Sequence, residues 1–228
     1  MNTARIVSIS KPMIDGIETA EDFIAYAARV SNPSNQMNTE TSDRLLRYCF
    51  RNKHFSIFEM VNVVMQIDTT RDIARQILRH RSFSFQEFSQ RYADPTGDLG
   101  FSNREARLQD TKNRQNSIET DDDDLSIEWA DRQVGLIKHA ADLYKWAIEN
   151  NIAKEQARVV LPEGLTNSRL YMNGTLRSWI HYIQLRTDEY VDPRTGDIIK
   201  GTQKEHREVA ESARDQLNQH FPFMKEVW

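Results

Sequence analysis

Cations, hydroxyl groups and one carboxylate are concentrated in residues 79–91, which read Arg-His-Arg-Ser-Phe-Ser-Phe-Gln-Glu-Phe-Ser-Gln-Arg. Arginine guanidinium groups bind phosphate and carboxylate through paired hydrogen bonds, and a serine hydroxyl adds a further donor. This density of cationic and donor groups predicts a site for an anionic ligand. The alternative interpretation is a solvated cationic surface that binds nothing.

The segment before this run repeats the cationic pattern. Arg71, Arg75 and Arg79 are spaced by four residues, so on a helix they form one stripe in which like charges repel. The stripe therefore calls for a counter-charge. A phosphate, a cofactor, nucleic acid or the chain's own carboxylates could supply it; for Arg71 and Arg75 we expect Asp68, Asp72 or a neighbouring subunit.

The charge balance of the chain limits the possible ligands. The 228 residues carry a net charge of −4, with 21 Arg against 9 Lys. General nucleic-acid-binding domains are usually basic, so the net charge argues against that class. The excess of Arg favours a local phosphate or carboxylate site, although codon usage explains it equally well.

The hydrophobic content, 39%, is sufficient for a core. No apolar stretch approaches the roughly 20 residues of a membrane-spanning helix. We therefore expect a soluble, cytoplasmic protein that binds neither membrane nor nucleic acid.

Common catalytic motifs are absent from the sequence. There is neither a Walker-type Gly-rich loop nor a GxGxxG turn, so a flavin or nicotinamide would have to be held by side chains. The six histidines show no HExxH-like pairing, and we expect no metal site. Ser82, Ser84 and Ser89 lie in no GxSxG motif. The single cysteine, Cys49, lies on the apolar face of an expected helix, where it is expected to be a core residue and not a nucleophile.

Hydrophobic patterning predicts an α/β (α+β) fold, with a mixed, largely antiparallel sheet flanked by long helices. Strands are expected over residues 4–10, 60–68 and 165–172, and helices over residues 19–30, 42–50, 70–80, 126–150, 153–159, 175–186 and 202–220. No linker divides the chain, so we expect a single domain over residues 1–228.

Helix caps and faces add detail to this prediction. Ser42 and Thr175 are expected N-caps, and Thr202 with Glu205 forms a capping-box pattern. Residues 110–124 are polar and acidic and are expected to be mobile or solvated, and residues 188–200 form a turn-rich excursion. The apolar face expected for helix 126–150 consists of Trp129, Val134, Leu136, Ile137, Ala140, Leu143, Tyr144 and Ala147.

The motif formed by Arg79-His80-Arg81, seven intervening residues and Ser89 resembles the signature of the flavin-dependent thymidylate synthases, the ThyX family. Further segments resemble the family in the same order, namely residues 54–59 (HFSIFE), 157–162 (ARVVLP), 175–181 (TLRSWIH) and 185–187 (LRT). The resemblance covers residues 45–220. Gln90 is a departure, because the family usually has Gly or Ala at this position.

The resemblance implies two sets of site residues. FAD would be held by Ser56, Arg79, His80, Arg81, Glu87, Thr175, Leu176, Arg177 and His181, with His54 on the flavin side near the folate. The phosphate and uracil of dUMP would be bound by Gln76, Arg79, Glu87, Phe88, Ser89, Gln90, Arg91, Arg158 and Arg186, of which Arg186 corresponds to the activating residue of the family. From the residues alone, His54 could equally be a structural or surface histidine, and Glu87 a counter-ion of Arg79 or Arg81.

The activity implied by the resemblance is reductive methylation of dUMP to dTMP, with 5,10-methylenetetrahydrofolate as carbon donor and NADPH-reduced FAD as hydride source. Methylation at C5 of uracil requires electron density there, and a guanidinium beside N3 and its carbonyls favours the enolate-like pyrimidine. Arg186 is too basic to accept a proton, so charge stabilisation is its expected role. The resemblance also implies a homotetramer whose active sites are shared between chains.

Two other classes remain open at this stage. An arginine-rich nucleic-acid-binding module would use the arginine stripe on backbone phosphates. A metal-dependent nucleotide hydrolase would need a carboxylate cluster, and residues 121–124, four aspartates, are the only dense one.

Overall fold

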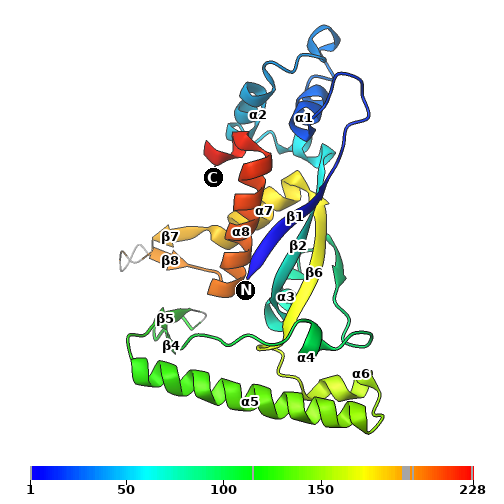
Figure 1. Cartoon of the computed structure of the whole chain (residues 1–228). Coiled ribbons are helices and arrows are strands. Elements are labelled where there is room, and N and C mark those ends of the chain that lie inside the picture. The colour runs from blue at the N-terminus through cyan, green and yellow to red at the C-terminus, as the bar shows by residue number, and fades with distance from the viewer. Residues whose placement is uncertain (1, 115, 192–195, 197, 227) are drawn as a thin grey trace.

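A four-stranded antiparallel sheet forms the centre of the molecule in the computed structural model, which describes residues 2–114, 116–191, 196, 198–226 and 228 (Figure 1). The strand order is β1 (Thr3–Ile9), β2 (Asn62–Thr70), β6 (Asn167–Thr175) and β3 (Ser84–Glu87). Strands β2 and β6 pair over their full lengths, with Asn62 opposite Thr175 and Thr70 opposite Asn167. Helix α3 (Arg71–Ile77) follows β2 directly and α7 (Leu176–Thr187) follows β6. The two helices therefore start at opposite ends of one strand pair.

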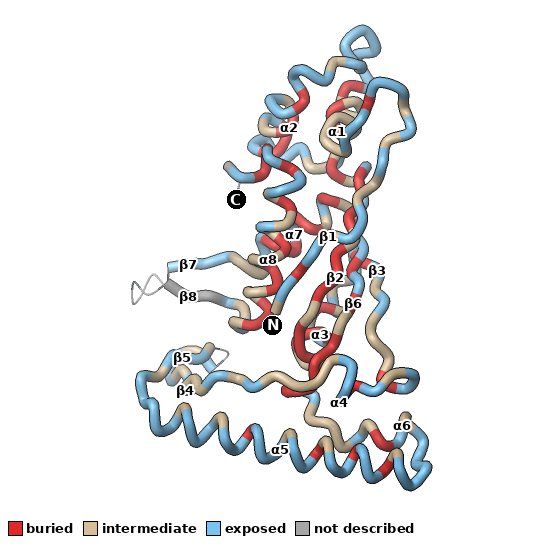
Figure 2. Tube along the Cα trace, viewed as in Figure 1, coloured by how far each residue is buried: buried red, intermediate tan, exposed pale blue. Residues whose placement is uncertain are grey.

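Helices α3, α7 and α8 (Lys204–His220) enclose the core with the sheet. Ser212 of α8 accepts a hydrogen bond from the backbone N–H of Ala4 in β1, over 2.9 Å. Trp179 of α7 is fully buried and donates its indole N–H to the carbonyl of Val63 in β2, over 3.0 Å. Figure 2 shows that buried residues run along β2, β6, α3 and α8. The core thus fixes the positions of α3 and α7, the two helices that carry predicted site residues.

The end of the molecule that holds the C-terminus contains α1 (Ala20–Ala28), η1 (Pro33–Asn35), α2 (Ser42–Arg51), η2 (Phe55–Met60) and η4 (Pro222–Glu226) (Figure 1). Aromatic side chains join these elements: the rings of Phe58 and Phe223 are stacked at 5.7 Å, and Phe50 contacts Phe58 edge-on. Cys49 is 6% exposed on α2, so its predicted core position is confirmed.

The opposite end contains α4 (Pro95–Asp98), β4 (Arg107–Gln109), β5 (Ser117–Glu119), α5 (Asp123–Glu149), α6 (Lys154–Ala157) and η3 (Arg158–Val160) (Figure 1). The aspartate run starts a helix here. Asp122 caps α5 and accepts a hydrogen bond from the N–H of Leu125 over 2.9 Å, while Asp123 and Asp124 occupy the first turn, where carboxylates favour the helix dipole. Part of the segment 110–124 is therefore regular and exposed. Its mobility stays a prediction.

The predicted apolar face of α5 is only half buried. Tyr144 and Ala147 pack in a small cluster with Ala157 of α6, and Ala140 is buried as well. Four other predicted members are 38–53% exposed, namely Trp129, Val134, Leu136 and Leu143. The first half of α5 is attached to the protein by a polar residue, because buried Gln133 bonds both the N–H and the carbonyl of Arg104.

Of the two N-caps predicted from single residues, one agrees with the structure and one differs. Thr175 is the N-cap of α7, as predicted, and its hydroxyl accepts from the N–H of Ser178 over 3.2 Å. Ser42, by contrast, is the first residue of α2, and the N-cap, Thr41, makes no capping bond with its side chain.

The predicted capping box at α8 is wrong. The N-cap is Gln203, without a side-chain capping bond, and α8 begins at Lys204. Glu205 makes no hydrogen bond to Thr202 among the described residues, although it accepts from the side chain of Gln203. It forms ion pairs with Arg104 at 3.0 Å and Arg107 at 2.7 Å, because two guanidinium groups attract a carboxylate more strongly than one N–H.

The predicted fold class is confirmed, and every strand pairing within the described part of the chain is antiparallel. In the turn-rich segment 188–200, β7 (Glu189–Val191) pairs with β8 (Ile198–Lys200); residues 192–195 and 197 lie outside the described residues. No helix among the described residues is both long and apolar enough to cross a membrane. Single-domain organisation and a cytoplasmic location stay predictions.

Candidate active site

The Arg-His-Arg motif lies in a turn between α3 and β3. Helix α3 ends at Ile77, three residues before the predicted end, and the N–H of Phe83 donates to the carbonyl of His80 over 3.3 Å. Phe83 anchors the turn, since its ring contacts that of Trp179 edge-on at 4.9 Å and is 9% exposed. Phe83 therefore attaches the motif to the core, while Arg79 and Arg81 are exposed.

Arg186, near the end of α7, meets this motif. Its Nε and Nη2 atoms lie 3.2 and 2.9 Å from Nε2 of His80. A guanidinium is a donor only, so His80 must accept through Nε2 and carry its proton on Nδ1. The structure thus brings together His80 and Arg186, residues 106 positions apart that the resemblance had placed in one site.

The surroundings of this contact keep the imidazole of His80 neutral and disfavour the charge of the Arg186 guanidinium. Burial, followed by the charges of Arg186 and His181, lowers the pKa of His80 to about 4. Burial also lowers the pKa of Arg186, with a further decrease from repulsion by Arg79. Arg79 has no ion pair among the described residues, so an anionic ligand would relieve this repulsion.

Two buried residues beneath His80 were not predicted as site residues. Tyr182 of α7 and His206 of α8 are 0% exposed, and the ring of Tyr182 contacts that of His80 edge-on at 4.9 Å. The Tyr182 hydroxyl and the His206 Nε2 lack hydrogen-bond partners. Sequence reasoning could have found His206, because it lies three and four residues before buried Val209 and Ala210 on the apolar face of α8.

A second cationic group lies at the other end of the strand pair, where α3 begins. A cavity of about 270 Å³ is lined by Arg71, Arg75, Gln90, Arg158, Val159, Leu161 and Glu163. Gln90 is 4% exposed, and within the described part of the chain its Nε2 donor has no hydrogen-bond partner. Burial lowers the pKa of Arg71, and the charges of Arg75 and Arg158 lower it further, against the opposing effect of Glu87. Three guanidinium groups and an unpaired donor thus meet at one cavity.

The counter-ions of the arginine stripe are not the predicted ones. Arg71 pairs with Glu87 at 3.6 Å, and Arg75 pairs with Glu163 at 2.8 Å. Asp68 and Asp72 are used elsewhere, by Arg169 and Arg104. Glu87 also accepts from the hydroxyl of Ser168 over 2.8 Å, and it pairs with neither Arg79 nor Arg81.

Of the other residues predicted for dUMP, Gln76 lies in α3, and Phe88, Ser89 and Arg91 lie in the turn after β3. Phe88 donates its backbone N–H to the carbonyl of Arg169, and the hydroxyl of Ser89 accepts weakly from the N–H of Arg91 at 3.4 Å. The guanidinium of Arg91 lies over the ring of Tyr92 at 5.8 Å, and both side chains are exposed. Arg91 is therefore available to a ligand.

A third group surrounds Glu59, which the prediction omitted as a site residue. Its carboxylate accepts from the Thr175 hydroxyl over 2.6 Å and from Arg177 over 2.9 Å. Ser56, His54 and His181 are exposed, whereas Leu176 is fully buried in the core and donates its N–H to the carbonyl of Val61. A ligand would reach the backbone or the neighbours of Leu176 but not its side chain.

Within the described residues, no hydrogen bond or ion pair joins the group around His80 and Arg186 to the group around Gln90 and Arg158. Helix α3 separates them, because the first group lies at its end and the second at its start. Predicted dUMP residues thus fall into two groups in one chain, and the exposed cations of each face outward.

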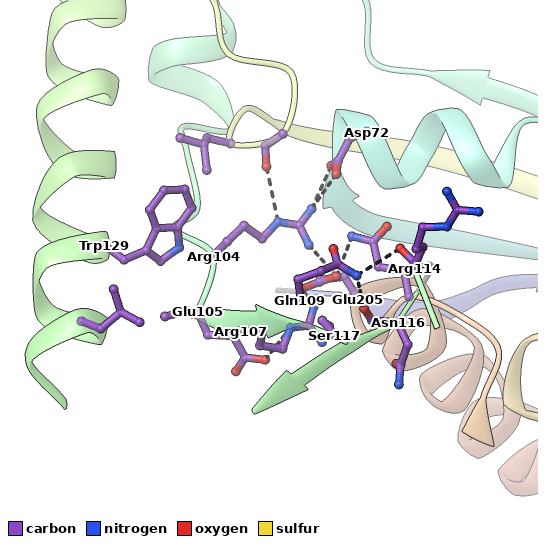
Figure 3. Close-up of a pocket in the computed structure, with 15 residues that line it drawn as sticks. Asp72, Arg104, Glu105, Arg107, Gln109, Arg114, Asn116, Ser117, Trp129 and Glu205 are labelled. Atoms are coloured by element: carbon purple, nitrogen blue, oxygen red, sulfur yellow. Dashed lines mark hydrogen bonds and ion pairs between the residues drawn. The ribbon is translucent and has the colours of Figure 1, made fainter. Parts of the chain in front are cut away.

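A further cavity, of about 640 Å³, lies between α5, the β4–β5 hairpin and the start of α8 (Figure 3). Arg104 points into it from one side and Glu205 from the other, and Trp129 of α5 forms part of its wall. Two of the three arginines that line it are already paired: Arg104 pairs with Asp72 and Glu205, and Arg107 pairs with Glu205. None of the predicted site residues line this cavity.

Metal ligands do not gather in the part of the chain that the structure describes: no group of three or more His, Cys, Asp or Glu side chains could hold an ion there.

A protein-family model described as "Thymidylate synthase complementing protein" matches residues 13–223. The chain belongs to this family. The match includes the Arg-His-Arg motif, Ser89, Arg158 and Arg186, so the resemblance based on these residues is confirmed.

Relatives in this family are similar to the chain over nearly its whole length. A probable flavin-dependent thymidylate synthase of Paramecium bursaria Chlorella virus 1 is 47% identical over 220 residues, which are 96% of this chain and 95% of the relative. A flavin-dependent thymidylate synthase of Synechocystis is 48% identical over 222 residues, with the same shares.

Solved structures with this fold include a UMP/dUMP methylase, PolB, of Streptomyces cacaoi. The structure bound with 5-Br dUMP has a TM-score of 0.72 at 26% identity and aligns over 99% of this chain and 93% of the other. The structure bound with 5-Br UMP has a TM-score of 0.76, also at 26% identity, over 99% and 92%. This chain and the methylase thus share the arrangement of sheet and helices described above.

Proposed function

We propose that this chain is a flavin-dependent thymidylate synthase that converts dUMP to dTMP with 5,10-methylenetetrahydrofolate as carbon donor. One observation carries the proposal. The guanidinium of Arg186 is partly buried, held against neutral His80 and repelled by Arg79, in a chain whose relatives bear this name. A fixed cation with no carboxylate partner among the described residues suits a substrate that gains negative charge during the reaction.

Arg186 is the proposed catalytic residue. Placed beside N3 and the carbonyls of uracil, its guanidinium lowers the energy of the enolate-like pyrimidine and raises the electron density at C5, where the new carbon is attached. His80 holds the guanidinium in place through its Nε2 acceptor and stays neutral, so it does not compete for the negative charge. Gln76 and Arg79 would complete the pyrimidine side of the site.

The phosphate of dUMP would bind at the second cationic group. Ser89, Arg91 and Arg158 supply donors there, and the unpartnered Nε2 of Gln90 adds a buried one. A dianionic phosphate beside Arg158 would also reduce the mutual repulsion that lowers the pKa of Arg71. The residues of this group therefore fit a phosphate.

FAD fits the exposed cations of the Arg-His-Arg turn. Arg79 and Arg81 carry no ion pair among the described residues and can hold its phosphates, and Thr175 and Arg177 are oriented by Glu59 for further contacts. Ser56, Glu87 and His181 would complete this set, with His54 on the folate side. When bound and reduced by NADPH, FAD supplies the hydride that turns the transferred methylene into a methyl group.

We further propose a homotetramer with active sites shared between chains. Two features support this assembly. The two cationic groups of one chain lie at opposite ends of α3, and α5 exposes large apolar side chains, including Trp129 and Trp146, of the kind that interfaces cover. Mixing an inactive Arg158→Ala protein with an inactive Arg186→Ala protein should restore part of the activity after subunit exchange. No recovery in a mixed tetramer would refute the sharing of sites.

The visible spectrum of the purified protein tests the function. We expect flavin absorption that NADPH bleaches, that dUMP with methylenetetrahydrofolate restores, and that is accompanied by dTMP. UMP should be compared with dUMP, because PolB was solved with an analogue of each. Protein that never takes up FAD would overturn the proposal.

The two alternative classes give different results in the same preparation. An arginine-rich nucleic-acid-binding module would be colourless and would bind DNA or RNA with strongly salt-dependent affinity. A metal-dependent nucleotide hydrolase would release phosphate or pyrophosphate only with Mg²⁺, and chelation would abolish this release.

A further inference from the structure

A continuous row of hydrogen bonds connects buried His206 to the carboxylate of buried Glu205 at the start of α8. The Nδ1 of His206 lies 3.2 Å from Oε1 of Gln76 in α3. Gln76 donates through Nε2 to Oε1 of Gln203, over 2.8 Å, and Gln203 donates through Nε2 to Oε2 of Glu205, also over 2.8 Å. Four side chains from two helices and one loop thus form a single row, which we call the Glu205–His206 row.

The far end of the row is an ionised carboxylate. Glu205 is 6% exposed, and its two oxygens pair with Arg104 at 3.0 Å and Arg107 at 2.7 Å (Figure 3). Burial raises the pKa of Glu205, but a backbone N–H bond and the charge of Arg104 more than offset this, so the pKa lies below its usual value. Glu205 can therefore only accept hydrogen bonds.

This one constraint sets the direction of every other bond in the row. Gln203 must turn its amide nitrogen to Glu205, which leaves its oxygen facing Gln76. Gln76 must then donate to Gln203, so its own oxygen faces His206. His206 must therefore carry its proton on Nδ1. If any one amide were reversed, two acceptors or two donors would face each other.

The surroundings of His206 agree with this tautomer. The residue is 0% exposed, and its Nε2 has no hydrogen-bond partner among the described residues, as expected for a buried lone pair without a proton. Burial, followed by the charges of Arg186 and His80, lowers the pKa of His206 to about 3. A neutral imidazole has one N–H, and the row requires it at Nδ1.

We propose that Glu205 and His206 are positioning residues, which hold the amide of Gln76 in one orientation for the pyrimidine of the substrate. This inference rests on the proposed function, because only the family resemblance assigns Gln76 to dUMP. The row uses one N–H of Gln76 on Gln203 and one lone pair on His206, so the edge left for the ligand has a fixed order of donor and acceptor. Without these two bonds, the amide of Gln76 could turn over and present its donor and acceptor in either order. In one of the two orders its donor would face a donor of the pyrimidine and its acceptor would face an acceptor.

The tautomer of His206 is measured first, in apo protein, by magic-angle-spinning ¹⁵N spectra of histidine-labelled samples. The spectrum of His206→Asn identifies the signals of His206 by their loss. We expect protonated Nδ1 and bare Nε2 in the wild type, and a second tautomer in Glu205→Gln, whose amide no longer dictates a direction. Glu105→Gln is the matched control, because Glu105 contacts the same Arg107 but lies outside the row. A wild-type Nε2–H tautomer, or equal effects of the two Gln variants, would overturn the inference.

The affinity for dUMP is measured next, in FAD-loaded protein, by calorimetry. His206→Phe keeps an aromatic ring but removes the donor, and we expect roughly tenfold weaker dUMP binding with unchanged FAD content. His206→Asn places an amide N–H near the position of Nδ1 and should recover most of the affinity. Gln203→Met breaks the row at an exposed residue, and should match His206→Phe.

Two results separate this inference from the proposed function. Wild-type affinity in both His206→Phe and Gln203→Met, or equal losses in His206→Phe and His206→Asn, would overturn the positioning role while the enzyme stays a thymidylate synthase. Wild-type protein that binds no dUMP would overturn the function and the role of Gln76 together. The apo spectra would still report the direction of the row.

Discussion

Gly174 of β6 allows the Arg-His-Arg turn to lie on the sheet, and Gly174→Ala should disturb both. A Cβ atom at this position would lie 2.5 Å from Cε1 and 3.3 Å from Cγ of Phe83, and closer still to Cδ1. The ring cannot move away easily, because it packs edge-on against Trp179 at 4.9 Å. The clash must therefore move Phe83 and, through it, the turn that holds His80.

The magnitude follows from two opposing effects. Overpacking of a well-filled core costs about 1–3 kcal/mol, whereas replacing Gly by Ala recovers about 0.4–1 kcal/mol from the unfolded chain. We therefore expect Gly174→Ala to lower the free energy of unfolding by about 1–2 kcal/mol. For a chain of this size that corresponds to a melting temperature lower by roughly 2–8 °C. FAD content should fall too, since Arg79 and Arg81 move with the turn.

Differential scanning calorimetry at fixed protein and FAD concentrations measures the effect, and a double-mutant cycle with Phe83→Leu assigns it. The smaller side chain clears space for the new methyl group, so the double variant should be more stable than the sum of the two single changes by at least about 0.5 kcal/mol. A wild-type melting temperature for Gly174→Ala, or strict additivity in the cycle, would refute this packing.

Three further perturbations test other parts of the site and core. Cys49→Ala should keep full turnover at a cost of about 1 kcal/mol in stability, because the thiol is buried and burial raises its pKa; lost dTMP formation with normal FAD content would contradict this. Arg186→Lys should reduce turnover at least about 100-fold while the flavin spectrum persists, since an ammonium lacks the planar pair of donors; near-normal turnover would exclude the proposed role. Burial raises the pKa of Glu21 from 4.5 to about 7, so the folded protein holds a proton that the unfolded chain releases, and stability should decrease as pH rises from about 4.5 to 7. Glu21→Gln should remove this slope and stabilise the protein by about 1–2 kcal/mol at pH 8, after allowance for partial exposure; urea midpoints that stay parallel to wild type between pH 5 and 8 would rule it out.

Local patterns in the sequence predicted the features that depend on neighbouring residues. Thr175 caps α7 because a hydroxyl three residues before an N–H can bond it without help from the rest of the chain. Cys49 is buried because the spacing of apolar residues places it on the inner face of α2. The Arg-His-Arg motif was recognisable because its spacing from Ser89 is itself a local pattern.

Pairing between distant residues was beyond local reasoning. Arg75 is paired with Glu163, 88 residues away, although Asp72 lies nearby on the same helix. Glu205 matched a capping box in sequence, but it is paired with Arg107, 98 residues away. In each case more than one partner was possible from the neighbouring sequence. The packing of distant segments decided which carboxylate and which cation form the pair.

The apolar face of α5 was misjudged for a different reason. Trp129, Leu136 and Leu143 have the spacing of a buried face, and periodicity reports only that such a face exists. Periodicity does not identify the element or chain that covers this face. Among the described residues, an apolar cluster covers Tyr144 and Ala147 near the end of the helix, so the exposed residues are the part of the pattern that the proposed tetramer would explain.

The arginine stripe shows how pairing within the chain and ligand binding divide one set of charges. Arg71 and Arg75 have carboxylate partners, and their repulsion is offset inside the chain. Arg79 has no such partner among the described residues and instead repels Arg186, whose hydrogen bonds within that part of the chain go to the neutral imidazole of His80. Pairing Arg186 with a carboxylate would stabilise the empty protein but would cancel the charge that an electron-rich pyrimidine needs. The repulsion between Arg79 and Arg186 therefore persists in the ligand-free protein until an anion binds. The free energy of folding that this repulsion costs is recovered as affinity for the anion.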